Sequence, residues 1–217
     1  MTYRAVIFDF GGVITSSPFE AFNRLEHERG LPRDLIRRVN AADPDANAWA
    51  RFERAEIDAA AFDRLFAGEA ARLGHELRGA DVLAVLAGDI RPRMVAALDR
   101  LKALGYALGC ITNNVPADMH GDPAKAEAVD AILARFDHVI ESSKVGVRKP
   151  DPRIYGMMTD ALGVPASACV YLDDLGINCK PAAAMGMAAI KVRGEDQALA
   201  ELERVLRLAP GALSGSA

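Results

Sequence analysis

The sequence has no long apolar run and no long run of basic residues. Its apolar stretches are far shorter than the ~20 residues that a helix needs to cross a bilayer. Residues 1–4 lead directly into an apolar stretch without the pattern of a signal peptide. The net charge is −4, with acidic and basic residues interspersed. We therefore expect neither a membrane nor a nucleic acid as a partner.

Cysteine is scarce as well. The three cysteines, Cys110, Cys169 and Cys179, show none of the Cys-x-x-Cys or Cys/His spacings of zinc sites. Cys110 and Cys169 fall within apolar, strand-like runs, where cysteine usually acts as a small hydrophobic residue. These features argue against a disulfide framework, and we expect a protein of the reducing cytoplasm.

Apolar runs of strand length alternate with helical segments from Pro92 onward. The pattern predicts strands at 106–111, 138–140, 169–172 and 188–192, and helices at 92–104, 121–135, 152–162, 178–185 and 196–207. A further strand ends at Asp9. This alternation predicts an α/β fold: a Rossmann-like parallel sheet core flanked by helices, with right-handed crossovers.

Residues 17–88 have a different pattern. Their apolar residues recur at helical spacing, alanine is abundant and β-branched runs are absent, which predicts four or five helices. We therefore expect a helical cap at 17–88, inserted after the first strand into an α/β hydrolase core formed by 1–16 and 89–210, and a disordered tail at 211–217. Trp49 and Phe52 lie one helical turn apart, and we expect them to fill the core of the cap rather than to contact substrate.

Polar side chains follow several of the predicted strands. Asp9 follows the first strand, Thr112-Asn113 the second and Asp173-Asp174 the fourth, and Lys149 lies in a loop at the same edge. Ligands of an open parallel sheet bind at the carboxyl ends of its strands, where these side chains lie. Neighbouring carboxylates repel each other unless a cation joins them, and hard oxygen ligands favour Mg²⁺. Lysine adds a point charge suited to phosphate, so the pattern indicates a site for Mg²⁺ and a phosphate group.

Four stretches in this order resemble the motifs of the haloacid dehalogenase-like hydrolases. They are 8–13, 111–113, 149–155 and 171–178. Within that family, residues 139–146 and 172–187 are most similar to the N-terminal phosphatase domain of soluble epoxide hydrolase. The resemblance spans the core, whereas the cap matches only in its position and helical character.

The resemblance implies a magnesium-dependent phosphatase. Asp9 would be the nucleophile that attacks phosphorus and forms an aspartyl-phosphate. The Mg²⁺ ion would be held by the carboxylates of Asp9 and Asp174 and by the main-chain carbonyl of Gly11, with Asp173 in support. The substrate would be a small phosphorylated metabolite.

The resemblance also implies how the phosphate group is held. Thr112 and Asn113 would bind phosphoryl oxygens, and Lys149 would bridge the nucleophile and the phosphate. Asn178 either serves this site or only caps the helix that begins there. The sequence leaves the oligomeric state open between a monomer and a homodimer.

The chain departs from the family at Gly11. Most phosphatases of the family carry there a second aspartate, which protonates the leaving group and later activates water. A positioned acid/base contributes ~10²–10⁴-fold to the rate. We therefore expect slow turnover of alkyl phosphates and faster turnover of aryl, acyl or anomeric phosphates.

Two alternatives remain. In a hydrolytic 2-haloacid dehalogenase the same aspartate attacks carbon, but that branch needs no metal, usually has a bulky residue at the position of Gly11 and lacks the acidic pair Asp173-Asp174. The chain could also be a non-catalytic phosphate-binding or regulatory domain, although the intact Asp9 and Lys149 argue against that.

Overall fold

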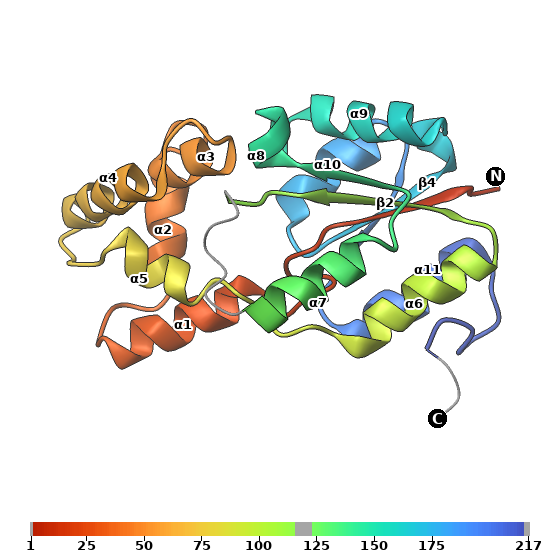
Figure 1. Cartoon of the computed structure of the whole chain (residues 1–217), viewed down its shortest axis with the longest axis horizontal. Helices are drawn as coiled ribbons and strands as arrows, with labels where there is room; N and C mark the ends of the chain where they lie inside the picture. Colours follow the sequence, from red (N-terminus) through yellow and green to blue (C-terminus); the bar gives the residue numbers. More distant parts are fainter. Residues whose placement is uncertain (1, 116–122, 215–217) are drawn as a thin grey trace.

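Five parallel strands form one sheet in the computed structural model, which describes residues 2–115 and 123–214 (Figure 1). The strands are β1 (Ala5–Phe8), β2 (Ala107–Thr112), β3 (His138–Glu141), β4 (Cys169–Asp173) and β5 (Ala188–Lys191). Their order is β3-β2-β1-β4-β5, so the first strand of the chain lies at the centre. The predicted α/β, Rossmann-like parallel sheet is thus confirmed.

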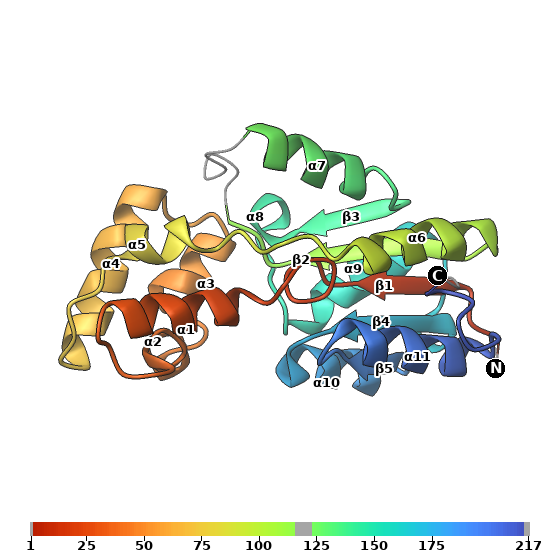
Figure 2. The same cartoon turned by 90° about the horizontal axis from the view of Figure 1, so that it is seen from below.

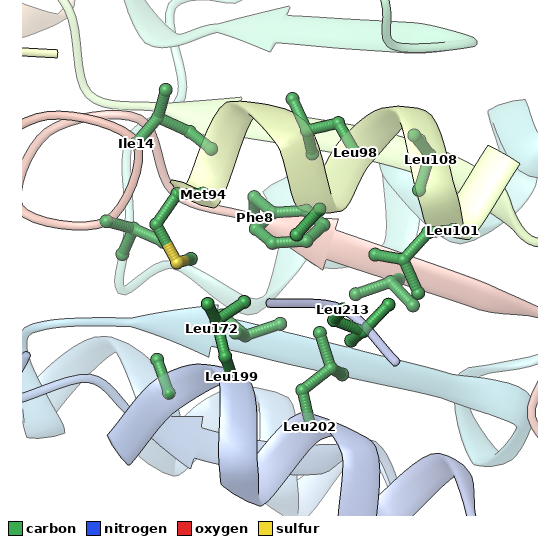
Figure 3. Close-up of a cluster of buried hydrophobic side chains, with 14 of the residues drawn as sticks. Phe8, Ile14, Met94, Leu98, Leu101, Leu108, Leu172, Leu199, Leu202 and Leu213 are labelled. Atoms are coloured by element: carbon green, nitrogen blue, oxygen red, sulfur yellow. The ribbon is translucent and has the colours of Figure 1, made fainter. Parts of the chain in front are cut away.

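Helices cover both faces of the sheet. One face packs against α6 (Pro92–Ala103), α7 (Pro123–Leu133) and α11 (Glu195–Leu206), and the other against α9 (Pro152–Leu162) and α10 (Gly176–Ala184). Successive side chains of a strand point to opposite faces. Phe8 accordingly lies among side chains of α6 and α11 (Figure 3), whereas Ile7 packs on the opposite face. Two buried faces explain why the strands read as continuous apolar runs.

The helices of residues 18–84 gather beside the carboxyl ends of the strands (Figure 2). They are α1 (Pro18–Glu28), α2 (Leu35–Ala42), α3 (Ala48–Glu53), α4 (Ala59–Arg72) and α5 (Gly79–Ala84). They bury an apolar cluster of their own, in which the ring of Phe62 lies 4.8 Å from that of Phe52 and 5.5 Å from that of Trp49. Trp49 and Phe52 therefore belong to the core of this helical unit, as expected.

Two adjacent linkers join the helical unit to the sheet. Thr15 and Ile90 form an antiparallel bridge, and Ser16 N–H donates to the carbonyl of Asp89 at 2.8 Å. The guanidinium of Arg91 donates to the carbonyl of Gly12 at 2.8 Å, which ties the second linker to the loop after β1. The entry and the exit of the helical unit are thus held side by side, next to the end of β1.

Some details differ from the sequence-based expectations. A short helix, α8 (Ser142–Val145), follows β3, a 3-10 turn (Ala166–Ala168) precedes β4, and α10 begins two residues earlier than predicted. Residues 121–122 of the helix predicted at 121–135 lie outside the described residues. Among the described residues, no helix has the length and apolar character that crossing a bilayer requires.

The prediction of a disordered tail from Gly211 is wrong for its first residues. The carboxylate of Glu203 accepts hydrogen bonds from the main-chain N–H groups of Gly211 at 2.9 Å and Leu213 at 2.8 Å. The Leu213 side chain is fully buried in the core cluster of Figure 3. The small and polar residues of this segment gave no sign in the sequence that Leu213 would be buried. Residues 215–217 lie outside the described part of the chain.

Candidate active site

Carboxylates meet at the ends of β1 and β4, which are neighbours in the sheet. Asp9 directly follows β1, and its N–H donates to the carbonyl of Leu172 in β4 at 2.8 Å. Asp173 ends β4, and Asp174 follows it. Each of the three aspartates offers an oxygen, and these oxygens lie within 4.8 Å of one another. The parallel register of the two strands is therefore what assembles the cluster.

Lys149 places its ammonium group between two of these carboxylates. Its Nζ lies 2.7 Å from Oδ1 of Asp9 and 2.9 Å from Oδ2 of Asp173, and it donates to the carbonyl of Ile111 at 2.9 Å. The side chain has no solvent exposure. A buried ammonium with three oxygen partners is held in one orientation.

The main chain of Lys149 is fixed by Asn113. The side-chain oxygen of Asn113 accepts the N–H of Lys149 at 2.8 Å, and its Nδ2 donates to the carbonyl of Lys149 at 3.0 Å. The amide side chain of Asn113 thus positions the lysine. Thr112, the other residue that we expected to bind phosphate, is the partly exposed last residue of β2 and lies beside the end of β1.

Burial and charge act together on the ionisable groups. Burial raises the pKa of Asp9 well above its usual value, and the Lys149 ammonium opposes this rise. Burial would lower the pKa of Lys149, but the charges of Asp173 and Asp9 outweigh it, so its pKa is raised and the group stays cationic. Burial, followed by repulsion from Asp173, raises the pKa of Asp174. One ammonium thus faces three carboxylates, and a further cation would relieve the repulsion.

Asp173 is surrounded by hydrogen-bond donors. Besides Lys149, they are the hydroxyl of Tyr171 at 2.5 Å, the N–H of Leu175 at 2.8 Å and Nδ2 of Asn178 at 3.1 Å. The N-cap of α10 is Leu175, so Asn178 lies within the helix and binds Asp173 rather than capping the helix.

The donor set fits Mg²⁺. Asp174 accepts one hydrogen bond from Ser17 Oγ at 2.9 Å, and Asp9 accepts the N–H of Phe10 at 2.6 Å as well as Lys149. These carboxylates and the main-chain carbonyl of Gly11, in the loop that follows Asp9, offer hard oxygen ligands of the kind that Mg²⁺ takes. The carboxylate of Asp173 is already occupied by its four donors.

Position 11 is open space. A Cβ added to Gly11 would meet no atom within 4 Å. The φ angle of Gly11 is not in the positive range that favours glycine. The backbone at this position would therefore accept an ordinary side chain. The structure brings together Asp9, Lys149, Asp173 and Asp174, and it leaves room beside them at Gly11.

The contacts of Tyr171 and Glu53 near the site were not expected from the sequence. Tyr171 lies two positions before Asp173, so the side chains point to the same face of β4, and that spacing could have indicated the contact. Glu53 reaches the core from α3 in the helical unit, and its carboxylate contacts Arg148 and Asn113. Its only sequence signal is that it follows Trp49 by one helical turn on the buried side.

Comparison with known proteins places the chain among hydrolases. A family model described as haloacid dehalogenase-like hydrolase matches residues 3–186. Bifunctional epoxide hydrolase 2 of Sus scrofa is 31% identical over 221 residues, which cover 94% of this chain but only 39% of that protein. A phosphatase of Mycobacterium tuberculosis is 30% identical over 200 residues, which cover 88% of each chain.

Solved structures share the fold. A HAD family enzyme of Bacteroides thetaiotaomicron in complex with magnesium and inorganic phosphate has a TM-score of 0.61 and 20% identity, covering 89% of this chain and 96% of its own. The L-2-haloacid dehalogenase of Xanthobacter autotrophicus has a TM-score of 0.60 and 20% identity, and the match covers 98% of this chain and 86% of the dehalogenase chain. The fold is therefore shared by an enzyme that binds magnesium and phosphate and by a dehalogenase, and the family model and sequence relatives identify this chain as a member of the haloacid dehalogenase-like hydrolases.

Proposed function

We propose that the chain is a magnesium-dependent phosphatase that hydrolyses small phosphomonoesters through an aspartyl-phosphate on Asp9. The observation that carries this proposal is the buried Lys149 ammonium, 2.7 Å from Oδ1 of Asp9. An anionic carboxylate can approach an anionic phosphate only where positive charge is already in place. The phosphatase of M. tuberculosis, similar over 88% of both chains, supports the same chemistry.

In the first step, a carboxylate oxygen of Asp9 forms a bond to phosphorus while the bond from phosphorus to the ester oxygen breaks. In the second step, water attacks phosphorus, and the bond to Asp9 breaks to release inorganic phosphate. Lys149 neutralises charge beside the reacting carboxylate. Thr112 and the amide of Asn113, at the end of β2, would bind phosphoryl oxygens. A bound Mg²⁺, held by Asp9, Asp174 and the Gly11 carbonyl, would supply further positive charge for the phosphate.

Asp173 acts through Lys149 in this scheme. Its carboxylate accepts the Lys149 ammonium at 2.9 Å and is itself oriented by Tyr171 and Asn178. Its place in the reaction is to keep the lysine charged and pointed at Asp9. We therefore assign Asp173 a positioning role and leave the metal to Asp9 and Asp174.

The glycine at position 11 limits the leaving group. An alkoxide leaves slowly without a proton donor, whereas a phenolate, a carboxylate or the oxygen of an anomeric phosphate leaves as a more stable species. We infer that the substrate is an aryl, acyl or anomeric phosphate of a small metabolite.

The helices of residues 17–88 form the cap that would select the substrate, and residues 1–16 and 89–210 form the catalytic core. The buried, unpaired thiols of Cys110 and Cys169 support a reducing, cytoplasmic setting.

A screen of phosphate esters with and without Mg²⁺ tests the proposal. We expect release of phosphate from 4-nitrophenyl phosphate and acetyl phosphate only with Mg²⁺, and none from Asp9→Asn. Activity that needs no metal, or that survives Asp9→Asn, would overturn the mechanism. Chloride release from 2-chloropropionate would instead identify a dehalogenase, and phosphate binding without turnover of any ester would identify a regulatory domain.

A further inference from the structure

Glu53, the last residue of α3, is a buried carboxylate at the junction of cap and core. Its side chain is only 8% exposed, and it accepts hydrogen bonds from Trp49 Nε1 at 2.8 Å in the same helix and from Arg148 Nε at 2.6 Å in the core. Burial raises the pKa of Glu53, and the Arg148 guanidinium opposes this rise. A buried carboxylate is costly unless it is paired, so its place in the fold depends on the cap lying against the core.

Arg148 contacts the cap at two points. In addition to the bond to Glu53, its Nη1 donates to the carbonyl of Pro44 at 3.0 Å. The hydroxyl of Ser142, at the start of α8, donates to the main-chain carbonyl of Glu53 at 2.7 Å. Beside this cluster the two parts separate around a cleft of about 450 Å³ that Asp45 and Arg54 line from the cap side. The Glu53 cluster therefore joins cap and core beside this cleft.

The same cluster touches the groups that hold the catalytic lysine. Arg148 immediately precedes Lys149 in the chain. Nδ2 of Asn113 lies 3.4 Å from Oε2 of Glu53, and the Asn113 side chain binds both the N–H and the carbonyl of Lys149. A continuous set of contacts thus runs from the end of α3 to the main chain of Lys149. Glu53 itself, bonded to Arg148 and Trp49, is poorly placed to donate a proton.

We propose that Glu53 is a positioning residue, which couples the docking of the cap to the orientation of Lys149 through Arg148 and Asn113. The inference rests on the proposed phosphatase function, in which Lys149 bridges Asp9 and the phosphate. With the cap displaced, Glu53 would no longer contact Arg148 and Asn113, and the segment that carries Lys149 would lose this support. The full catalytic arrangement then exists only while the cap covers the site, which limits reaction to the enclosed substrate.

Glu53→Gln tests the coupling because it keeps the size of the side chain and removes the charge that binds Arg148. Glu26→Gln is the matched control: Glu26 is also a buried cap glutamate, but it accepts the N–H groups of Asp34 and Ile36 within the cap. With 4-nitrophenyl phosphate we expect Glu53→Gln to lower kcat by about tenfold or more while KM changes little, since a misplaced catalytic group slows chemistry. We expect Glu26→Gln to keep kcat within about twofold, because a cap contact that does not reach Lys149 cannot displace it.

Arg148→Met and the double variant Glu53→Gln/Arg148→Met complete the test. If the two residues act as one unit, kcat of the double variant falls no further than that of the more impaired single variant. A raised KM with an unchanged kcat, or an additive loss in the double variant, would overturn the proposal. An inactive wild-type protein, or an active Asp9→Asn variant, would instead refute the proposed function.

Hydrogen exchange gives a readout that needs no activity. The N–H of Lys149 is bonded to Oδ1 of Asn113 at 2.8 Å, so loss of the support from Glu53 should let it exchange faster. We expect residues 146–151 to exchange faster in Glu53→Gln than in the wild type, and at the wild-type rate in Glu26→Gln. Equal exchange of this segment in all three proteins would show that Glu53 does not position Lys149.

Discussion

The carboxylate of Asp174 packs directly against the Cα of Gly12. A Cβ at position 12 would lie 2.2 Å from Oδ2 of Asp174, and the backbone of Gly12 has a φ of +78°. Both the contact and the dihedral angle require glycine. The loop after β1 can thus lie flat against a proposed metal ligand only because this residue has no side chain.

Gly12→Ala should therefore damage both the fold and the metal site. The left-handed backbone alone costs ~1–2 kcal/mol for a residue with a Cβ, and the methyl group must push Asp174 away. We expect a lower free energy of unfolding in urea and weaker Mg²⁺ binding by calorimetry. Gly11→Ala is the control for stability: its Cβ meets open space, and we expect its free energy of unfolding to stay within about 0.5 kcal/mol of the wild type. Equal stability of Gly12→Ala and the wild type would refute the close contact.

Gly11→Asp should restore a general acid. The backbone and the space at Gly11 accept a side chain, and a positioned acid/base contributes ~10²–10⁴-fold. We expect kcat/KM for an alkyl phosphate to rise by at least about tenfold, and that for 4-nitrophenyl phosphate to change far less, because a nitrophenolate leaves without a proton. The ratio of the two rates, measured with the same enzyme preparation, is the relevant quantity. An unchanged ratio would show that another group already supplies the proton.

Lys149→Met should destabilise the protein strongly. It removes the ammonium between Asp9 and Asp173 and leaves two buried carboxylates facing each other, a change that costs ~3–5 kcal/mol. The free energy of unfolding in urea, measured in EDTA, checks this. We expect Asp9→Asn/Lys149→Met to recover part of the loss, since one of the repelling charges is gone. A double variant no more stable than Lys149→Met would contradict the electrostatic explanation.

Mg²⁺ should raise the thermal midpoint of the wild-type protein. A ligand that binds only the folded state stabilises it by mass action, ~2.7 kcal/mol at a hundred times its Kd. Asp174→Asn removes one proposed ligand, and we expect it to abolish most of this shift while the protein in EDTA stays folded. Differential scanning calorimetry with and without Mg²⁺ measures both. A wild-type midpoint that does not respond to Mg²⁺ would argue against a metal at this site.

Ala55→Gly should stabilise the cap. Ala55 follows the end of α3 and has a φ of +55°, in the left-handed region that disfavours residues with a Cβ. Glycine relieves a strain of ~1–2 kcal/mol but loses more entropy on folding, so we expect a net gain of about 0.5–1 kcal/mol. Chemical denaturation of the two proteins in parallel checks the sign. A loss of stability would mean that the methyl group of Ala55 makes a contact worth more than the strain.

Much of this site could be predicted from the sequence because it depends on topology. The carboxyl ends of parallel strands lie on the same side of a sheet, so Asp9 and Asp173 were expected on that side. Their direct approach depends on β1 and β4 being neighbours, which the sequence does not show. The contact between Glu53 and Arg148 could not be predicted in the same way, since it joins positions 95 residues apart through the docking of the cap. The anchoring of Leu213 could not be predicted for a similar reason: Glu203, whose carboxylate binds the main chain of Gly211 and Leu213, belongs to α11.

The paired linkers at Ser16 and Asp89 have a consequence for the length of the helical segment. The chain leaves and re-enters the sheet through Ser16 and Asp89, whose main chains are hydrogen-bonded at 2.8 Å. The sheet therefore does not set the length of the helical segment between these two residues. Insertions, deletions or the exchange of the whole helical segment can occur there without moving a strand. Changes in this segment that keep Glu53 in contact with Arg148 would therefore leave both the sheet and the segment around Lys149 in place.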